Sequence, residues 1–276
     1  MKLQNTSINR ILPCRGWKPT TAILSLIMAS TLPLLAGDGG GTDPANPGVK
    51  PPLVQTEPYG KTYGEWSAKW WQWTLAFPAN ADPASDTAPY DSAQSGKVWF
   101  LATAHGSATV HGSATVTRSL KVPHGKALFF PLLTVYVDNT GCPYNDPLLT
   151  ADQLASQAAD IFTAVSQTTC TIDGVAVQGL DDPQHTLYRV QSPPFSFTVA
   201  SHDNLLAAVF GEPCIPDGTT VNPAVSDGVF LMVAPLSVGQ HTIHFVGVVG
   251  PVASPFFFKD ITYNLTVAPG NGGDQD

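Results

Sequence analysis

Large aromatic residues after position 60 recur with the spacing of one face of an α-helix. Thr62 and Glu65 form a capping-box sequence, in which each side chain can bond the backbone N–H of the other residue. Pro78 is expected to end the helix, because proline cannot continue the hydrogen-bond pattern. One face of the predicted helix carries aromatic side chains at intervals of four, three and four residues: Trp66, Trp70, Trp73 and Phe77.

A second helix is predicted over residues 151–166. Thr150 and Gln153 again have the spacing of a capping box, so the helix is expected to begin at residue 151. Its apolar stripe is formed by Leu154, Ala158, Ile161, Phe162 and Val165.

Elsewhere the apolar positions alternate with a period of two, which is typical of half-buried strands. Asp173-Gly174 lies between β-branched residues in 171–177 and predicts a tight hairpin there. The hexapeptide at 105–110 recurs at 111–116, and because six is even, a longer hairpin would keep every side chain on its face. Further strands are predicted at 97–102, 115–122, 127–137, 195–199, 229–233, 241–249 and 260–267.

Many short strands separated by Pro and Gly predict a mainly β chain. We expect a single-domain antiparallel β-sandwich, Ig-like or jelly-roll-like, with two peripheral α-helices. The sandwich domain is expected to cover residues 59–267. A Gly- and Pro-rich linker over 37–58 would precede it, and a disordered tail over 268–276 would follow it.

The first segment has the pattern of a secretory signal peptide. Residues 2–18 contain four cations and no acid, and an apolar stretch follows over 22–36. The alternative, a membrane anchor, is disfavoured because Pro33 interrupts the stretch and about 20 apolar residues are needed to span a bilayer. We therefore expect residues 1–36 to be removed, leaving a secreted or periplasmic protein with no membrane span.

Charge excludes one large class of function. Only 12% of the residues are charged, the net charge is −8, and the cations form no cluster. Nucleic-acid binding needs clustered cations opposite the phosphates, so a nucleic-acid partner is not expected.

Export would place the cysteines in an oxidising compartment. Loss of the signal peptide would leave Cys142, Cys170 and Cys214, an odd number. Cys142 and Cys214 lie in turn-like sequences, and we predict a disulfide between them. Cys170 adjoins a predicted strand and would remain a free thiol, although the sequence alone leaves other pairings open.

An ordered series of motifs resembles a family of uncharacterised secreted bacterial proteins. The most distinctive is the Trp-rich segment 65–73, and the match covers about residues 60–267. No activity is established for that family, so the resemblance implies extracytoplasmic localisation and a single domain. The duplicated hexapeptide departs from the family pattern. The other motifs are residues 95–101, 122–131, 188–193, 224–228 and 239–245.

The sequence contains few signs of catalysis. It has no Gly-x-Ser-x-Gly elbow, no His-Glu-x-x-His and no Cys-x-x-Cys. His241 and His244 are the best transition-metal candidates. Their odd separation on a strand would place them on opposite faces, which disfavours a shared ion. Asp138 and other acidic turn residues could hold calcium through oxygen ligands. No cofactor is predicted, and calcium or a transition metal remains an open alternative.

The aromatic residues have two interpretations. Trp66, Trp70 and Trp73 are expected to pack against a sheet. Trp71 lies off that stripe, and we interpret it, together with Trp99, as a candidate surface for stacking on sugars. Tyr136 and Asp138 are two further candidates for ligand binding.

These patterns favour a secreted, non-catalytic binding or surface-associated module, with a glycan or other envelope component as the first candidate ligand. The first alternative is an extracytoplasmic hydrolase that uses Asp and His residues on sandwich loops, with or without a metal. The second is a structural component of envelope assembly that uses exposed strand edges.

Overall fold

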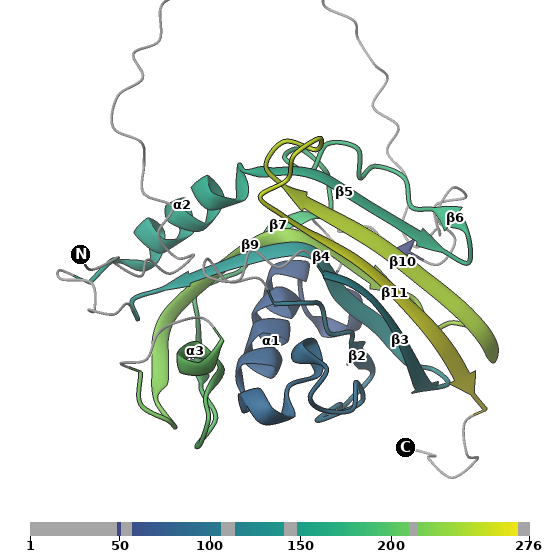
Figure 1. Ribbon diagram of the computed structural model, residues 1–276, viewed down its shortest axis with the longest axis horizontal. Helices are drawn as coiled ribbons and strands as arrows, with labels where there is room; N and C mark the ends of the chain where they lie inside the picture. Colours follow the sequence, from purple (N-terminus) through teal and green to yellow (C-terminus); the bar gives the residue numbers. More distant parts are fainter. Residues whose placement is uncertain (1–48, 51–56, 106–113, 141–147, 210–214, 270–276) are drawn as a thin grey trace, which may run out of the picture.

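The computed structural model describes residues 49–50, 57–105, 114–140, 148–209 and 215–269 (Figure 1). Over these residues the chain is mainly β, with two sheets stacked on each other and three α-helices, which confirms the predicted β-sandwich class. The helices are α1 (Tyr63–Leu75), α2 (Ala151–Phe162) and α3 (Leu205–Ala208). None of the described helices combines the length and apolarity needed to cross a bilayer.

The first sheet is built around the long strand β9, which pairs with β4 along one side and with three short strands along the other. β2 continues the sheet beyond β4. The strands are β1 (Val49–Lys50), β2 (Val98–Phe100), β4 (Ala127–Asp138), β7 (Arg189–Gln191), β8 (Phe195–Thr198) and β9 (Thr220–Val233).

The second sheet has the order β3-β11-β10-β5-β6. Its inward side chains pack on the first sheet, and Phe130 of β4 meets Phe245 of β10 with ring centroids 5.2 Å apart. The strands are β3 (Ala114–Pro123), β5 (Val165–Ile172), β6 (Val175–Ala176), β10 (Gly239–Val249) and β11 (Phe257–Ala268).

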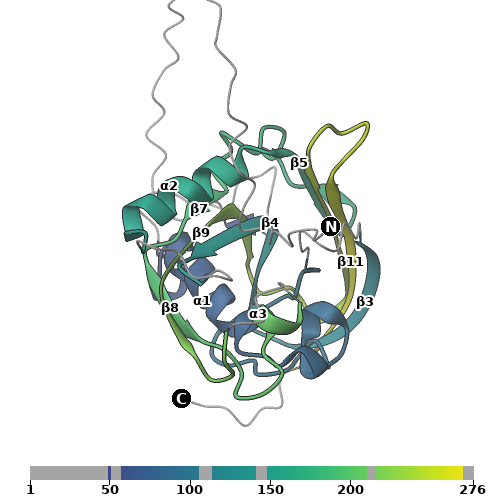
Figure 2. The same cartoon turned by 60° about the vertical axis from the view of Figure 1, so that its left-hand side comes forward.

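The first sheet is covered on both faces, which explains why β4 is buried along nearly its whole length. Leu128 and Phe130 face the second sheet, whereas Phe129 faces α1 and stacks on Phe230 of β9. α2 covers the far end of the same face as the second sheet, where Leu154 and Ala158 pack on β4 and β9. Figures 1 and 2 show α1 and α3 together on the opposite face.

The local signals in the sequence are confirmed. Thr62 and Thr150 cap α1 and α2, and both capping boxes are complete. The β5–β6 hairpin turns at Asp173 (φ 50°) and Gly174 (φ 79°), the two consecutive left-handed residues that a type I′ turn requires. α2 ends at Phe162 rather than 166, because Val165 already pairs with Val249 in the second sheet.

Three expectations about the arrangement need correction. The sheets are mixed rather than purely antiparallel, since β3 pairs with β11 and β2 with β4 in parallel. α1 is not peripheral, because its buried side chains pack with those of β4 and β9 in a second hydrophobic core, on the other face of the first sheet. The strand β8 was predicted, whereas β7 and the first half of β9 were not, and in β9 Pro223 and Gly228 interrupt the alternation that indicates a strand.

Parts of the domain prediction fall outside the described residues. These parts are the signal peptide at 1–36, most of the linker and tail, and most of the duplicated hexapeptides. Within the segment expected as linker, Val49 and Lys50 pair with Val233 and Met232 of β9.

Candidate functional site

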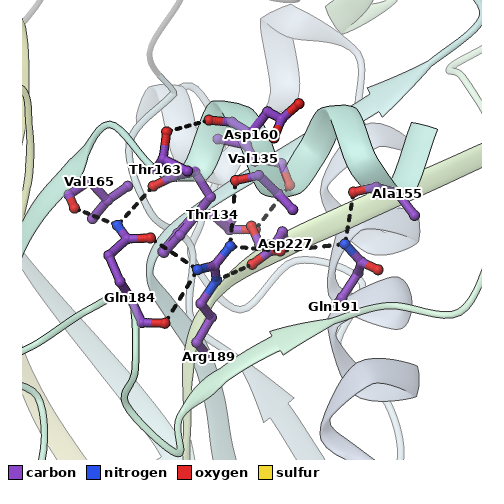
Figure 3. A network of polar contacts seen from close by, with 12 residues as sticks. Thr134, Val135, Ala155, Asp160, Thr163, Val165, Gln184, Arg189, Gln191 and Asp227 are labelled. Atoms are coloured by element: carbon purple, nitrogen blue, oxygen red, sulfur yellow. Dashed lines mark hydrogen bonds and ion pairs between the residues drawn. The ribbon is translucent and has the colours of Figure 1, made fainter. Parts of the chain in front are cut away.

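A polar network joins β7, β9 and α2 (Figure 3). The Arg189 guanidinium donates through Nε to Asp227 Oδ1 at 2.9 Å and through Nη2 to Asp227 Oδ2 at 3.2 Å. The Asp227 side chain is 5% exposed and that of Arg189 20% exposed. These two residues come from the motifs 188–193 and 224–228, which the sheet register places side by side.

The same network ties the end of α2 to the sheet. Arg189 Nη1 donates to the Gln184 side chain at 3.0 Å, and Gln184 Nε2 donates in turn to the backbone oxygens of Phe162 (3.1 Å) and Val165 (2.7 Å). The guanidinium lies 4.6 Å from the Phe162 ring centroid. A cation near the C-terminus of a helix interacts favourably with the helix dipole and so stabilises the helix. This network therefore has a structural role, and its polar groups are bonded to one another.

A second buried cation holds the irregular segment after α1 on the second sheet. Arg118 is 2% exposed and donates to Asp86 Oδ1 at 2.8 Å, to the backbone oxygens of Ala102 and Ala84, and to Tyr263 Oη at 3.1 Å. Its guanidinium is also engaged by protein groups on several sides. It is therefore a structural clamp rather than a free recognition group.

The two histidines expected as metal candidates lie on opposite faces of β10, as their spacing predicts. His241 Nδ1 is 2.7 Å from Asp173 Oδ2, which with the other bonds of His241 raises the pKa of this imidazole against the effect of its burial. His244 Nε2 is 2.8 Å from Asp260 Oδ1. Within the described residues, no group of three or more His, Cys, Asp or Glu side chains is placed to hold a metal ion.

The structure brings Trp71 and Tyr136 together, but inside the protein. Their ring centroids are 4.5 Å apart, and each residue is 5% exposed. Trp71 Nε1 donates to Thr134 Oγ1 at 3.3 Å. The prediction that Trp71 is exposed is therefore wrong, because Thr134 and Tyr136 of β4 contact this second side of α1. Trp99 is half-buried against the core between the sheets, and its Nε1 is buried without a hydrogen-bond partner.

Asp138 lies at the end of β4 and is 6% exposed. Its Oδ1 accepts from Thr140 N at 2.7 Å and from Thr140 Oγ1 at 2.6 Å, while its Oδ2 is buried without a hydrogen-bond partner. Burial raises the pKa of this carboxyl to about 6, against the lowering effect of the two bonds from Thr140. Its described contacts are those of an Asx turn, as expected for an acidic turn residue.

The predicted disulfide between Cys142 and Cys214 lies outside the described residues. Cys170 has a free thiol that is buried on β5, and burial raises its pKa. A protonated, inaccessible thiol is a poor nucleophile, so Cys170 is a core residue.

The aromatic residues that reach solvent on α1 are not those that the sequence singled out. We define the aromatic patch as Trp66, Trp73, Phe77 and Phe100, all half-buried. Phe100 lies between the two tryptophans, with ring centroids 6.2 Å from Trp66 and 5.6 Å from Trp73. Phe77 meets Trp73 edge to face at 5.4 Å.

Both indoles of the aromatic patch are held in place by the backbone. Trp66 Nε1 donates to Pro58 O at 2.8 Å, and Trp73 Nε1 donates to Ser92 O at 3.2 Å. Gln94 fixes Phe100 in turn, since its side chain bonds both the N–H and the C=O of that residue. The seven-residue spacing of Trp66 and Trp73 indicates one helix face, but the sequence does not show that the centre of the buried face lies at Trp70 and Trp71.

Comparison with known proteins gives no family. No protein-family model and no curated protein matches the chain. Among solved structures, PbICP-C in complex with falcipain-2 aligns with 63% of this chain and 100% of its own length at 9% identity, with a TM-score of 0.24. The cysteine protease inhibitor EhICP2 from Entamoeba histolytica aligns with 56% of this chain and 94% of its own at 12% identity, with a TM-score of 0.19. Likeness at these scores supports no conclusion about function.

Proposed function

We propose that the protein is a secreted, non-catalytic binding module and that the aromatic patch binds the sugar rings of an envelope glycan. The observation that carries the proposal is the pair Trp66 and Trp73, which are only half-buried while their indole N–H groups are fixed to backbone carbonyls. Fixed rings lose little conformational entropy when a ligand stacks on them, which favours binding.

The surroundings of the aromatic patch fit a ligand with both apolar ring faces and hydroxyl groups. Lys69 and Glu65 are exposed on α1 beside the tryptophans and can bond hydroxyls. The rings themselves offer apolar, polarisable surface of the kind that tryptophan supplies at ligand sites. A sugar polymer combines these two properties, whereas a small charged metabolite would need a concentrated opposite charge.

The arrangement of the ionisable groups favours binding over hydrolysis. Of the three buried acids in the described residues, Asp227 pairs with Arg189 and Asp82 lies 3.0 Å from His105, while Asp138 is turned inward with Oδ1 bonded to Thr140. A general acid or base needs a carboxyl that can reach substrate. The half-buried residues of the aromatic patch, by contrast, keep part of their surface exposed for a ligand.

Co-sedimentation with insoluble polysaccharides tests the proposal. The protein should sediment with at least one of chitin, cellulose and peptidoglycan sacculi. Trp73→Ala and Phe77→Ala should each weaken that binding about tenfold, which corresponds to about 1.4 kcal/mol. Phe77 lies beyond the end of α1, so its replacement tests the aromatic patch with less disturbance of the helix.

Phe256→Ala is the matched control, because Phe256 is an exposed aromatic residue (65%) outside the aromatic patch. It should bind as the unmodified protein does. Absence of binding to all three polysaccharides, or binding that survives both changes in the aromatic patch, would contradict the proposal.

A further inference from the structure

Two loops that are hydrogen-bonded to the turn between α2 and β5 carry exposed apolar side chains. Leu187 precedes β7 and is 68% exposed, while Val252 and Phe256 lie in the β10–β11 loop and are 58% and 65% exposed. We call these three residues the apolar tip. Large apolar side chains that project together into solvent mark interaction surfaces in folded proteins.

Both loops are attached to the same short turn between α2 and β5. The Gly250 N–H donates to Ala164 O at 2.8 Å, and Gln184 Nε2 donates to Val165 O at 2.7 Å. The loops therefore leave the sandwich from one place. Figures 1 and 2 show the β10–β11 loop projecting beyond the ends of its strands at this place.

The β10–β11 loop has a defined shape. Gly250 has φ 85°, and a Cβ there would lie 2.6 Å from the Phe256 ring, so the ring packs directly on the glycine backbone. Ser254 N bonds Pro251 O, and Phe256 N bonds Val249 O, both at 2.9 Å. The loop is held in this way, and Val252 and Phe256 remain largely exposed to solvent.

The charges around the apolar tip select the kind of surface that it can meet. Residues 250–256 contain no ionisable side chain, and Lys259 nearby on β11 is buried. On the other loop, Asp181 and Asp182 are exposed, and His185 Nδ1 is 2.7 Å from Asp182 Oδ2. Acids beside the apolar tip repel anionic headgroups and attract the ammonium groups of zwitterionic ones.

We propose that the apolar tip inserts into the surface of a zwitterionic phospholipid layer and attaches the protein there peripherally. The net charge of −8 also favours zwitterionic over anionic lipid, because a negatively charged protein is repelled by an anionic surface. Insertion removes the apolar tip from water while the acids stay at the headgroup level.

Vesicle sedimentation tests the inference with the protein purified from the compartment to which it is exported. The unmodified protein should bind phosphatidylcholine vesicles about tenfold more tightly than vesicles containing half phosphatidylglycerol. The double change Val252→Ser with Phe256→Ser should weaken binding to phosphatidylcholine about tenfold or more. Leu187→Ser is measured separately and should also weaken binding to phosphatidylcholine. Because Leu187 lies on the other loop, this result does not depend on the packing of Phe256 against Gly250.

The matched control is the double change Val175→Ser with Val238→Ser. These residues are 55% and 51% exposed, but they lie at the other ends of β5 and β10. The control should bind phosphatidylcholine as the unmodified protein does. Absence of binding to phosphatidylcholine, tighter binding to the anionic vesicles, or equal loss in the control would overturn the inference.

Discussion

The carboxylate of Asp227 receives two parallel hydrogen bonds from the guanidinium of Arg189, at 2.9 and 3.2 Å. The pair joins two strands of the first sheet at the place where α2 ends. Asp227 O also accepts from Thr134 Oγ1 at 3.1 Å, and that hydroxyl in turn accepts from Trp71 Nε1. One aspartate therefore links α1, β4, β7 and α2.

Removal of one partner of this pair should destabilise the fold strongly. We expect Arg189→Met to lower the free energy of unfolding by about 3 kcal/mol, because Asp227 would keep a buried and unpaired charge. Arg189→Met combined with Asp227→Leu should cost less than the sum of the two single changes, since the double change leaves no unpaired charge. Urea unfolding of the four proteins measures both effects.

The pair of Asp182 and His185 is the control for that experiment. Its side chains are 61% and 83% exposed, so solvent screens the interaction. Asp182→Asn should leave the unfolding curve unchanged. Additive losses for Arg189 and Asp227 would show that their interaction contributes nothing of its own.

The tryptophans of α1 should contribute unequally to stability. Trp70 is fully buried, and its Nε1 donates to Leu101 O at 3.0 Å, so Trp70→Ala should cost about 4 kcal/mol. Trp66 is half-buried, and its replacement by Ala should cost about half as much. Thermal and urea unfolding of the two variants compare them directly. Equal losses would contradict the burial that the structure assigns to these residues.

The sequence predicted what depends on neighbours in the chain. Thr62 with Glu65, and Asp173 with Gly174, act within three residues of each other, and both the helix cap and the hairpin turn are where they were expected. The strands β10 and β11 of the second sheet were also predicted, because one face of each is buried and the alternation is visible.

The features that the sequence did not predict depend on side chains being buried by segments that are distant in the chain. Trp71 is buried because Tyr136 of β4 packs on it, and Trp73 is anchored by Ser92 O from the segment that follows the helix. A helix covered on two sides has no single apolar stripe, so the periodicity assigned the wrong rings to the surface. Arg189 and Asp227 are 38 residues apart, and only the register of β7 with β9 brings them together.

Asp138 should make stability depend on pH. Its folded pKa of about 6 lies above the usual 3.8, so the folded state holds more protons than the unfolded state between these values. Stability from this group is therefore complete below pH 3.8 and is lost as the pH rises to about 6. We expect Asp138→Asn to stabilise the protein at pH 7.5 by up to about 3 kcal/mol, because the amide keeps the acceptor for Thr140 and carries no charge.

Urea unfolding at pH 4 and pH 7.5 measures this gain. At pH 4 the asparagine variant and the unmodified protein should differ little. Thr140→Val provides a comparison, because it removes the hydroxyl donor to Asp138 at 2.6 Å and leaves the carboxyl in place. An asparagine variant that is less stable at pH 7.5 would show that the charged carboxylate is favourable where it lies.

Lys259 should give the opposite dependence on pH. It is 5% exposed on the inner face of β11, and burial, with a smaller effect from Arg118, lowers its pKa from 10.5 to about 7. Between pH 7 and 10.5 the folded state holds fewer protons than the unfolded state, so the free energy of unfolding rises with pH in this window. Below pH 7 the ammonium must be accommodated inside the sandwich, beside the Phe257 ring at 5.8 Å.

Lys259→Met should therefore stabilise the protein below pH 7 by up to about 5 kcal/mol, and above pH 7 it should reduce the rise of the free energy of unfolding with pH. Lys121→Met on the exposed face of β3 is the control and should leave the slope unchanged, and an unaltered slope in the Lys259 variant would assign the pH dependence to other groups.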